Sequence, residues 1–330
     1  MKLSLSGGNA MHHILITFST MPEQFSLLQQ AAPGSEIKYI PSKQVTREDV
    51  LWADIILGNP PLAYLHENPN LGLLALSRAG SADCCEPGIL PEHTILTNAT
   101  GAYGIIISEW MIGMLLSIYN HFAVYRAQQE KHCWKKQTLG RHSIYGSKIL
   151  IVGAGNIGSE FARRAKAMGA YTIGVRRSNP QPDSCFDEMH LISDLDTLLP
   201  EADVVALSVP GTSETAHLMS DARLSLMKQG AVLLNVGRGS AVDSDALCRH
   251  LSSGHLLAAG LDVTEPEPLP PEHPLWAQPN AYITPHISGG MDSPISCQAI
   301  FEICLNNLRA YLGEGEYRNI VDRQTGYRRL

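Results

Sequence analysis

Short apolar runs alternate with longer segments of helical periodicity along most of the chain. The first five runs are rich in isoleucine and leucine and occupy residues 13–17, 36–40, 54–57, 73–76 and 94–97. Apolar strands that alternate with helices are typical of a parallel sheet covered on both faces. The pattern therefore predicts a small α/β domain in the N-terminal third of the chain.

A second series of apolar runs follows in the remaining two thirds. Its members are residues 148–152, 171–175, 203–209, 231–236, 257–263 and 281–284. Helical spacing of apolar residues separates them, as in residues 156–168, and Asp243 is suited to N-cap a helix over residues 244–251. These features predict a second doubly wound parallel sheet.

The most apolar segment, residues 104–119, begins a helix that is predicted to run to Arg126. It is too short to span a bilayer comfortably, and Glu109 interrupts it. We expect this helix to be buried between domains or subunits.

The last helical pattern covers residues 294–312 and follows a break at residues 288–290. No sheet of its own is left for this helix to cover. We therefore expect it to return to the first domain and to make that domain discontinuous.

Composition narrows the classes of function. The chain has 32 Asp and Glu against 25 Lys and Arg, a formal charge of −7, which argues against a nucleic-acid surface or a basic membrane-facing patch. Its seven cysteines show no zinc or redox spacing, so we expect free thiols in a reducing cytosol and no metal site. Residues 1–13 do not resemble a signal peptide, and we expect residues 1–10 to be disordered.

A glycine-rich turn follows the first strand of the second series. It reads Gly153-Ala154-Gly155-Asn156-Ile157-Gly158 and opens a predicted helix. The first glycine allows a tight turn, the second lets the backbone approach a pyrophosphate, the third permits close helix packing, and the helix N-terminus favours an anion. Because the strand, the helix and a second strand are all in place, the turn predicts a dinucleotide site.

The residues after the next strand bear on the choice of coenzyme. Folds that bind NAD usually carry Asp or Glu there, to bond the ribose 2′-hydroxyl, but this chain reads Arg176-Arg177-Ser178. Guanidinium groups and a hydroxyl hold a 2′-phosphate through charge-assisted hydrogen bonds. The run indicates NADP, and the alternative is a solvated charge pair on a loop.

Three polar residues, Arg238, Glu267 and His286, follow the ends of three consecutive predicted strands. Arg238 is suited to bind a carboxylate with a bidentate fork and to polarise a carbonyl, and its flanking glycines let the backbone lie close to a ligand. Histidine suits a proton donor near neutral pH, and a carboxylate bonded to the imidazole favours its protonated form. Because parallel strands end at one edge of a sheet, the trio predicts a hydride-transfer site.

With these motifs the chain resembles the D-isomer-specific 2-hydroxyacid dehydrogenase family over nearly its whole length, from Ile14 to Asp322. The matching segments are residues 151–158, 235–239, 260–268 and 283–290. The resemblance implies a flavodoxin-like substrate-binding domain, a Rossmann dinucleotide-binding domain, a cleft between them and a homodimer built around the helix after Gly104. The expected bounds are 1–104 with 288–330 for the former domain and 105–287 for the latter.

The resemblance also implies roles for single residues. Arg238 is the substrate clamp, Glu267 and His286 are the proton-transfer pair, and Asp262 lies near the nicotinamide. The residues expected to bind the cofactor are Gly153, Gly155, Asn156, Ile157, Gly158, Arg176, Arg177, Ser178, Pro210, Val236, Gly237, Arg238, Asp262 and His286. Those expected to bind the substrate are Ala79, Gly80, Ser81 and Arg238, and Arg78 and Tyr103 are candidates to line its pocket.

Two departures from the family pattern bear on function. Relatives commonly have a Ser-Ala-Gly-x-Asp turn whose amides bind the substrate carboxylate, whereas residues 77–83 read Ser-Arg-Ala-Gly-Ser-Ala-Asp, with the aspartate one position late. Arg176 replaces the acidic ribose binder, as in the NADP-preferring glyoxylate and hydroxypyruvate reductases.

The sequence therefore predicts a cytosolic oxidoreductase that transfers a hydride between NADPH, in preference to NADH, and C2 of a small 2-ketoacid or D-2-hydroxyacid. Two alternatives stay open: an NAD-dependent enzyme resembling phosphoglycerate dehydrogenase, and a non-catalytic protein that senses dinucleotides on the same fold. Retention of Arg238, Glu267 and His286 argues against pure binding.

Overall fold

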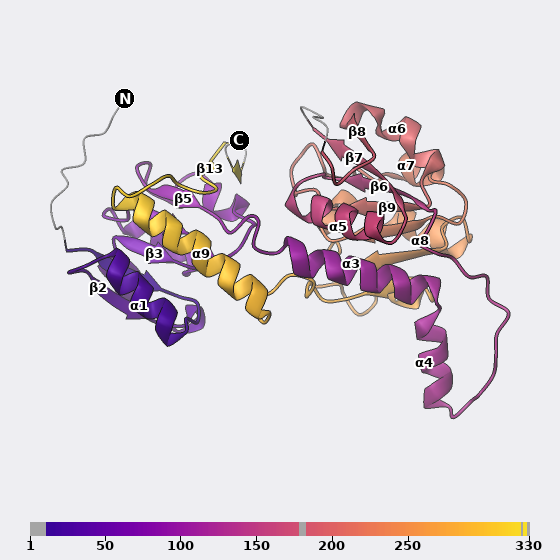
Figure 1. Ribbon diagram of the computed structural model, residues 1–330, viewed down its shortest axis with the longest axis horizontal. Helices are drawn as coiled ribbons and strands as arrows, with labels where there is room; N and C mark the ends of the chain where they lie inside the picture. The colour runs from indigo at the N-terminus through magenta and orange to yellow at the C-terminus, as the bar shows by residue number, and fades with distance from the viewer. Residues whose placement is uncertain (1–10, 178–182, 325, 329–330) are drawn as a thin grey trace. The chain divides into compact units, whose positions relative to one another are not determined.

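A computed structural model describes residues 11–177, 183–324 and 326–328 of the chain. Residues 1–10, for which the sequence predicts disorder, lie outside that description. The chain divides into two compact units, one of residues up to 102 together with 291–330, the other of residues 103–290 (Figure 1). Each unit contains one large parallel sheet, which confirms the predicted fold class of two doubly wound α/β domains.

The sheet of the first unit has the strand order β2-β1-β3-β4-β5, which is the order of flavodoxin-like folds. Its strands are β1 (His13–Ile16), β2 (Glu36–Tyr39), β3 (Ile55–Leu57), β4 (Leu73–Ala75) and β5 (Ile95–Thr97), and the short strands β13 (Val321–Asp322) and β14 (Tyr327–Arg328) form a separate pair. Its helices are α1 (Pro22–Ala31), α2 (Arg47–Trp52) and α9 (Pro294–Tyr311). Helix α9 packs on α1 and β4, so the predicted return of the last helix to the first domain is confirmed.

The sheet of the second unit has the strand order β12-β11-β10-β9-β6-β7-β8. Its strands are β6 (Lys148–Val152), β7 (Tyr171–Arg176), β8 (Glu188–Leu191), β9 (Val204–Leu207), β10 (Val232–Asn235), β11 (Ala258–Leu261) and β12 (Ala281–Ile283). Its helices are α3 (Gly104–Tyr119), α4 (Phe122–Glu130), α5 (Asn156–Ala167), α6 (Leu195–Leu198), α7 (Asp221–Leu226) and α8 (Ser244–Ser252). The strand order reverses between β6 and β9, where doubly wound sheets bind their ligands.

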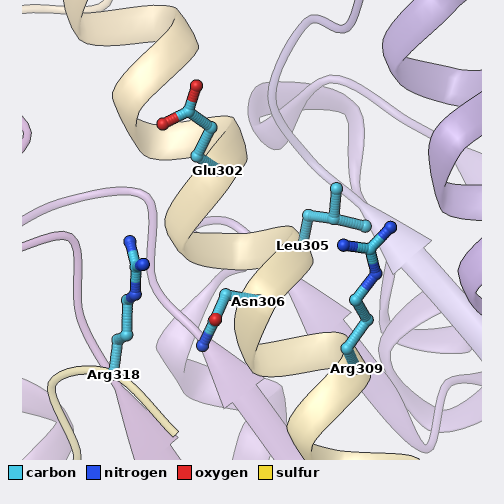
Figure 2. Close-up of a pocket in the computed structure, with 5 residues that line it drawn as sticks. All are labelled: Glu302, Leu305, Asn306, Arg309 and Arg318. Atoms are coloured by element: carbon cyan, nitrogen blue, oxygen red, sulfur yellow. The ribbon is translucent and has the colours of Figure 1, made fainter. Parts of the chain in front are cut away.

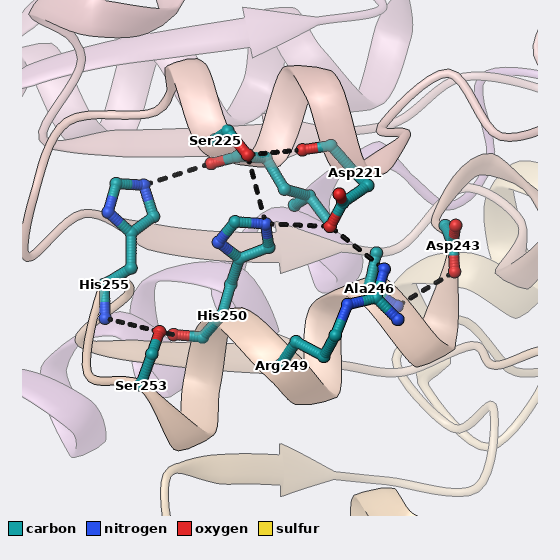
Figure 3. Close-up of polar contacts among 9 residues, drawn as sticks. Asp221, Ser225, Asp243, Ala246, Arg249, His250, Ser253 and His255 are labelled. Atoms are coloured by element: carbon teal, nitrogen blue, oxygen red, sulfur yellow. Dashed lines mark hydrogen bonds and ion pairs between the residues drawn. The ribbon is translucent and has the colours of Figure 1, made fainter.

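Helix α8 begins where the sequence predicts it to begin. The Asp243 carboxylate accepts a hydrogen bond from the amide of Ala246 at 2.9 Å, as an N-cap requires. At the other end of α8, Arg249 and His250 bond the Asp221 carboxylate of α7, at 3.0 and 3.2 Å (Figure 3). The hydrogen bond from Arg249 is the main reason why the pKa of Asp221 lies below its usual value.

One predicted feature of this unit is wrong, and one strand was missed. The helix expected over residues 104–126 is broken into α3 and α4, which are bent by 68°, because His121 between them has a left-handed φ of 56° that a right-handed helix does not accept. The edge strand β8 was not predicted, because two of its four residues are exposed and none is fully buried, so they form no apolar run.

Helix α3 packs along α5 within the second unit, with Met111 and Leu115 fully buried. In the part of the chain that the structure describes, no single helix is long and apolar enough to cross a membrane, and only the bent pair of α3 and α4 together reaches the length and composition of a span.

Candidate active site

The three strands that lead to the predicted chemical residues end level with one another. In the parallel register, Asn235 of β10 pairs with Leu261 of β11, and Leu261 pairs with Ile283 of β12. The loops after these strands therefore begin side by side at the carboxyl edge of the sheet, and they carry Arg238, Glu267 and His286. This edge is where open α/β sheets bind ligands.

The structure brings Glu267 and His286 into direct contact. Oε1 of Glu267 lies 2.6 Å from Nδ1 of His286, which is a short charge-assisted hydrogen bond when the imidazole is protonated. Both side chains are nearly half-exposed, at 42% and 45%, so solvent or a ligand can reach them. Because Glu267 occupies Nδ1, Nε2 is the ring nitrogen left to exchange a proton.

The loop that carries His286, residues 284–288, is held by the carboxylate of Asp262. This side chain is 1% exposed and accepts three hydrogen bonds: from the hydroxyl of Thr284 at 2.6 Å and from the amides of Ile287 and Ser288, both at 2.9 Å. The backbone carbonyl of Asp262 also accepts the amide of His286 at 2.8 Å. These bonds fix His286 in a left-handed conformation with φ of 54°, which is uncommon for a residue other than glycine.

The contacts of Asp262 with the loop of His286 were not indicated by the sequence. The sequence-based expectation places it near the nicotinamide as a cofactor-binding residue, and that role stays a prediction. In the structure both of its carboxylate oxygens bond the loop of His286. The side chain therefore positions the imidazole.

Arg238 is exposed at the start of the loop after β10. Its guanidinium Nη1 donates to the carbonyl of Gly237 at 2.7 Å, and among the described residues no hydrogen bond or ion pair joins it to Glu267 or His286. The buried side chain of Asn235 shapes the loop, since it donates to the carbonyl of Arg238 at 2.9 Å and accepts the amide of Gly237 at 3.0 Å.

The glycines on either side of Arg238 are required by the fold itself, and their expected role beside a ligand stays a prediction. A Cβ on Gly237 would lie 2.3 Å from the carbonyl oxygen of Val209, and a Cβ on Gly239 would lie 1.9 Å from that of Thr264. Both glycines are therefore required by close approach of the protein's own backbone. The second approach connects the loop of Arg238 to the loop that carries Glu267.

The glycine turn after β6 has the geometry that a dinucleotide requires. Gly153 has a left-handed φ of 101°, and a Cβ on Gly158 would lie 2.4 Å from the carbonyl oxygen of Gly153, so helix α5 can pack only on glycine. A Cβ on Gly155 would meet no atom within 4 Å, so the space in front of it is open. Helix α5 has no side-chain cap among the described residues, which leaves its first amides to bind an anion.

Other residues expected to bind the cofactor lie at the same edge of this sheet. Asn156 and Ile157 form the first turn of α5, Pro210 follows β9 and is exposed, and Val236 is buried directly after β10. Their contacts to a cofactor stay predictions.

The arginines at the end of β7 have partners within the protein itself. Arg176 donates through Nε to the carbonyl of Ala154 in the glycine turn at 2.6 Å, and its Nη2 lies 3.4 Å from the Asp183 carboxylate. Arg177 lies 3.5 Å from Glu214, and both of these side chains are largely exposed. Ser178, the third residue of the predicted run, lies outside the described residues.

The loop of residues 77–83 lies in the first unit, and its departure from the family pattern has a structural explanation. Nη2 of Arg78 lies 2.7 Å from each carboxylate oxygen of Asp83, so the unusual arginine pairs with the late aspartate. The side-chain amide of Asn98 donates to the carbonyl of Ala79, and the hydroxyl of Ser81 donates to the carbonyl of Gly326. Substrate binding by Ala79, Gly80 and Ser81 stays a prediction.

The same loop leads into Cys84, whose thiol is buried. Burial raises the pKa of Cys84 to about 12, so the side chain stays protonated near neutral pH. Tyr103, the other candidate to line the substrate pocket, precedes α3 in the second unit.

Sequence reasoning missed the residues that position the site. Asn235 and Thr284 were not among the candidates, although each is a polar residue at the end of an apolar strand. That placement was the signal that could have found them, because a buried polar side chain is normally hydrogen-bonded.

One surface hollow is separate from the candidate site. It has a volume of about 230 Å³ and lies in the first unit, against α9 and the turn after it (Figure 2). Its lining residues are Glu302, Leu305, Asn306, Arg309 and Arg318. No residue expected to bind substrate or cofactor lines it.

The second unit combines a Rossmann-type strand order, a glycine turn open to a dinucleotide and a Glu–His pair at one sheet edge. These features define a nicotinamide-dependent dehydrogenase. A family model, D-isomer specific 2-hydroxyacid dehydrogenase, NAD binding domain, matches residues 112–288. The chain belongs to this family, and it is an NAD(P)-dependent oxidoreductase.

Individual relatives agree with this assignment. The chain is 46% identical to glyoxylate/hydroxypyruvate reductase B of Escherichia fergusonii over 146 residues, 44% of each chain. A D-isomer specific 2-hydroxyacid dehydrogenase family protein from Aeromonas salmonicida gives a TM-score of 0.83 at 30% identity, covering 95% of this chain and 100% of that one. An NADPH-dependent glyoxylate/hydroxypyruvate reductase from Sinorhizobium meliloti, in complex with NADP and sulfate, gives 0.79 at 26% identity, covering 96% and 100%.

Replacement of Asp262 by asparagine tests its positioning role. The amide would present a donor where the loop of His286 also presents donors, so the loop should shift and the imidazole should move. A displacement of about 1 Å is enough to reduce kcat on the order of a hundredfold, and coenzyme affinity should stay unchanged if Asp262 acts only through the loop of His286. Steady-state kinetics and calorimetric titration of the coenzyme measure both quantities.

Asp245→Asn, a charge removal at an exposed position of α8, is the matched control and should leave both quantities unchanged. A loss of coenzyme affinity in parallel with kcat would instead place Asp262 in coenzyme binding.

Proposed function

We propose that the protein reduces a small 2-ketoacid to the D-2-hydroxyacid with NADPH. The observation that carries this proposal is the contact of Glu267 with Nδ1 of His286, at the edge of the sheet that also carries Arg238 and the open glycine turn. The coenzyme supplies the hydride, which passes from C4 of the nicotinamide to C2 of the substrate.

The protein supplies position, charge and a proton. His286 delivers the proton from Nε2 to the carbonyl oxygen of the substrate, and Glu267 keeps the imidazole oriented through its contact with Nδ1. Arg238 binds the substrate carboxylate and stabilises negative charge that develops on the carbonyl oxygen. Substrate binding by Ala79, Gly80 and Ser81 of the first unit, which the family resemblance implies, is part of the same proposal.

The contacts of Arg176 support the preference for NADPH. Its Nε bond to Ala154 places the guanidinium beside the glycine turn, at the end of the strand where NAD-binding folds usually carry an acidic residue. Arg177 and Ser178 complete the predicted phosphate site.

The relatives support a small substrate of the glyoxylate or hydroxypyruvate type, because two of them are reductases of these compounds. A panel of 2-ketoacids assayed with NADPH and NADH tests the substrate and separates this function from that of a phosphoglycerate dehydrogenase. Absence of turnover with every 2-ketoacid, with coenzyme binding intact, would favour the dinucleotide-sensing alternative.

The surface of the second unit supports a homodimer. Ile105 of α3 and Phe122 and Tyr125 of α4 are exposed apolar side chains, and no residue of α4 is buried. A mostly apolar hollow of about 400 Å³ adjoins α3 and β12.

The cysteines support a cytoplasmic location. All seven are free thiols, which fit a reducing cytoplasm.

The Glu267–His286 contact predicts the cost of losing either side chain. His286→Ala removes the proton donor, so reductive kcat/KM should fall roughly a hundredfold or more. Glu267→Gln keeps a side chain of the same shape beside Nδ1 but removes the carboxylate that orients the imidazole, so kcat should fall while coenzyme affinity stays unchanged. Steady-state kinetics and coenzyme titration measure both quantities. Wild-type kcat in Glu267→Gln would remove Glu267 from proton transfer.

Arg238 is proposed to bind the substrate carboxylate through two hydrogen bonds. We therefore predict that a positive charge alone is insufficient for substrate binding and turnover. Arg238→Lys keeps the positive charge but loses the bidentate geometry, so KM should rise and kcat should fall. Substrates that lack a carboxylate provide the control, because their reduction should be poor in the wild type already. Wild-type kinetics in Arg238→Lys, or equal activity on simple ketones, would contradict the clamp.

The position of Arg176 predicts the coenzyme preference. A charge-assisted contact to the 2′-phosphate is worth roughly 1.5–3 kcal/mol, about tenfold to a hundredfold in affinity. Isothermal titration should show tighter binding of NADPH than of NADH, a preference that salt weakens and that Arg176→Asp reverses. Equal or tighter binding of NADH by the wild type would show that the arginines form only a solvated surface.

A further inference from the structure

The guanidinium of Arg176 is bonded on two sides by the protein itself. Its Nε donates to the carbonyl of Ala154 at 2.6 Å, which fixes the side chain against the glycine turn. Its Nη2 faces Asp183, with 3.4 Å between this nitrogen and Oδ2. A coenzyme phosphate that approaches Arg176 therefore meets a guanidinium that already has an anionic partner.

Asp183 is an anchored carboxylate. Its Oδ1 accepts the amide of Cys185 at 2.9 Å, and only 27% of its side chain is exposed. The hydrogen bond from the Cys185 amide is the main cause that lowers the pKa of Asp183, and the charge of Arg176 and the hydroxyl of Ser159 act in the same direction. The side chain is therefore ionised at neutral pH and held in place from α5 as well as from its own loop.

We propose that Asp183 sets the coenzyme preference of this enzyme by competing with the 2′-phosphate for Arg176. The inference rests on the proposed role of Arg176 in NADPH binding. To bind Arg176 through its Nη atoms, the phosphate displaces or shares the Asp183 carboxylate, and the two negative charges repel one another. NADH carries no 2′-phosphate and meets no such competition. Asp183 therefore reduces the difference in affinity by which the enzyme favours NADPH over NADH.

The position of Asp183 in the sequence explains why its role is not evident from the pattern. An acidic residue that distinguishes NAD from NADP usually stands at the end of the second strand. Here Arg176 has that place. The carboxylate that lies beside it belongs to Asp183, seven positions further along the chain.

The neighbouring pair of Arg177 and Glu214 is expected to matter less. Its side chains are 63% and 68% exposed, and their separation is 3.5 Å. Ion pairs between solvent-exposed groups contribute little, because water and salt screen them. Glu214→Gln is therefore expected to change the affinity for either coenzyme by less than about twofold.

The test is isothermal titration of NADPH and NADH against the full-length Asp183→Asn variant. Asparagine keeps the shape of the side chain and an oxygen that can accept the Cys185 amide, but it removes the charge. We expect the Kd for NADPH to fall by about threefold to tenfold and the Kd for NADH to change by less than about twofold. Asp183→Ser, which also lacks the charge, should give the same direction.

The matched control is Asp196→Asn. It removes one carboxylate of the same unit and breaks the ion pair of Asp196 with Arg223, 2.6 Å long, which joins α6 to α7. Because neither residue adjoins the glycine turn, coenzyme affinity should not change. Melting temperatures confirm that every variant is folded.

A double-variant cycle with Arg176→Ala identifies the interaction responsible. If Asp183 acts through Arg176, the gain from Asp183→Asn should disappear when Arg176 is absent. A gain that persists would mean direct repulsion of the phosphate and would overturn the competition.

The outcomes separate the inference from the proposed function. Weaker or unchanged NADPH binding in Asp183→Asn, together with weaker NADPH binding in Arg176→Ala, would overturn the role of Asp183 and leave the NADPH site intact. Unchanged NADPH binding in Arg176→Ala would remove the phosphate site itself, and with it the basis of the competition.

Discussion

The geometry of the catalytic edge depends on one buried carboxylate, that of Asp262. A buried charge is costly unless it is fully hydrogen-bonded, and Asp262 meets this condition only because the loop after β12 supplies three donors. The same bonds hold His286 at a positive φ, beside Glu267. The hydrogen bonds that stabilise the buried carboxylate of Asp262 therefore also fix the position of the His286 imidazole.

Much of this arrangement could be predicted from the sequence, because its signals are local. Apolar runs identified most strands of the two large sheets, the glycine turn followed a strand and opened a helix, and Asp243 capped α8 as predicted. The failures have equally local causes. The apolar pattern of α3 continues past His121, so nothing in it revealed the left-handed residue that ends the helix. Strand β8 lies at an edge and two of its four residues are exposed, so it lacks an apolar run.

The features that sequence reasoning missed in the site depend on contacts between distant segments. The sequence pattern did not show that Gly237 and Gly239 are also required by the backbone of Val209 and Thr264, which occupies the positions that their side chains would take. Asn235 and Thr284 are single polar residues whose partners become apparent only when the strand ends are aligned. The sequence of one segment indicates which residues carry the chemistry. The residues that hold them in position lie on other segments, so the sequence of that one segment does not reveal them.

The second unit thus holds two acidic residues whose surroundings differ in a way that matters for function. Asp262 is buried and tied to backbone amides, so any change of its charge disturbs the loop that carries His286. Asp183 is more than a quarter exposed and forms an ion pair with Arg176, a residue of the proposed coenzyme site. Loss of the Asp183 charge leaves Arg176 hydrated and still bonded to Ala154, so the cost to the fold is small. Coenzyme preference can therefore change through Asp183 while the proton-transfer pair keeps its geometry.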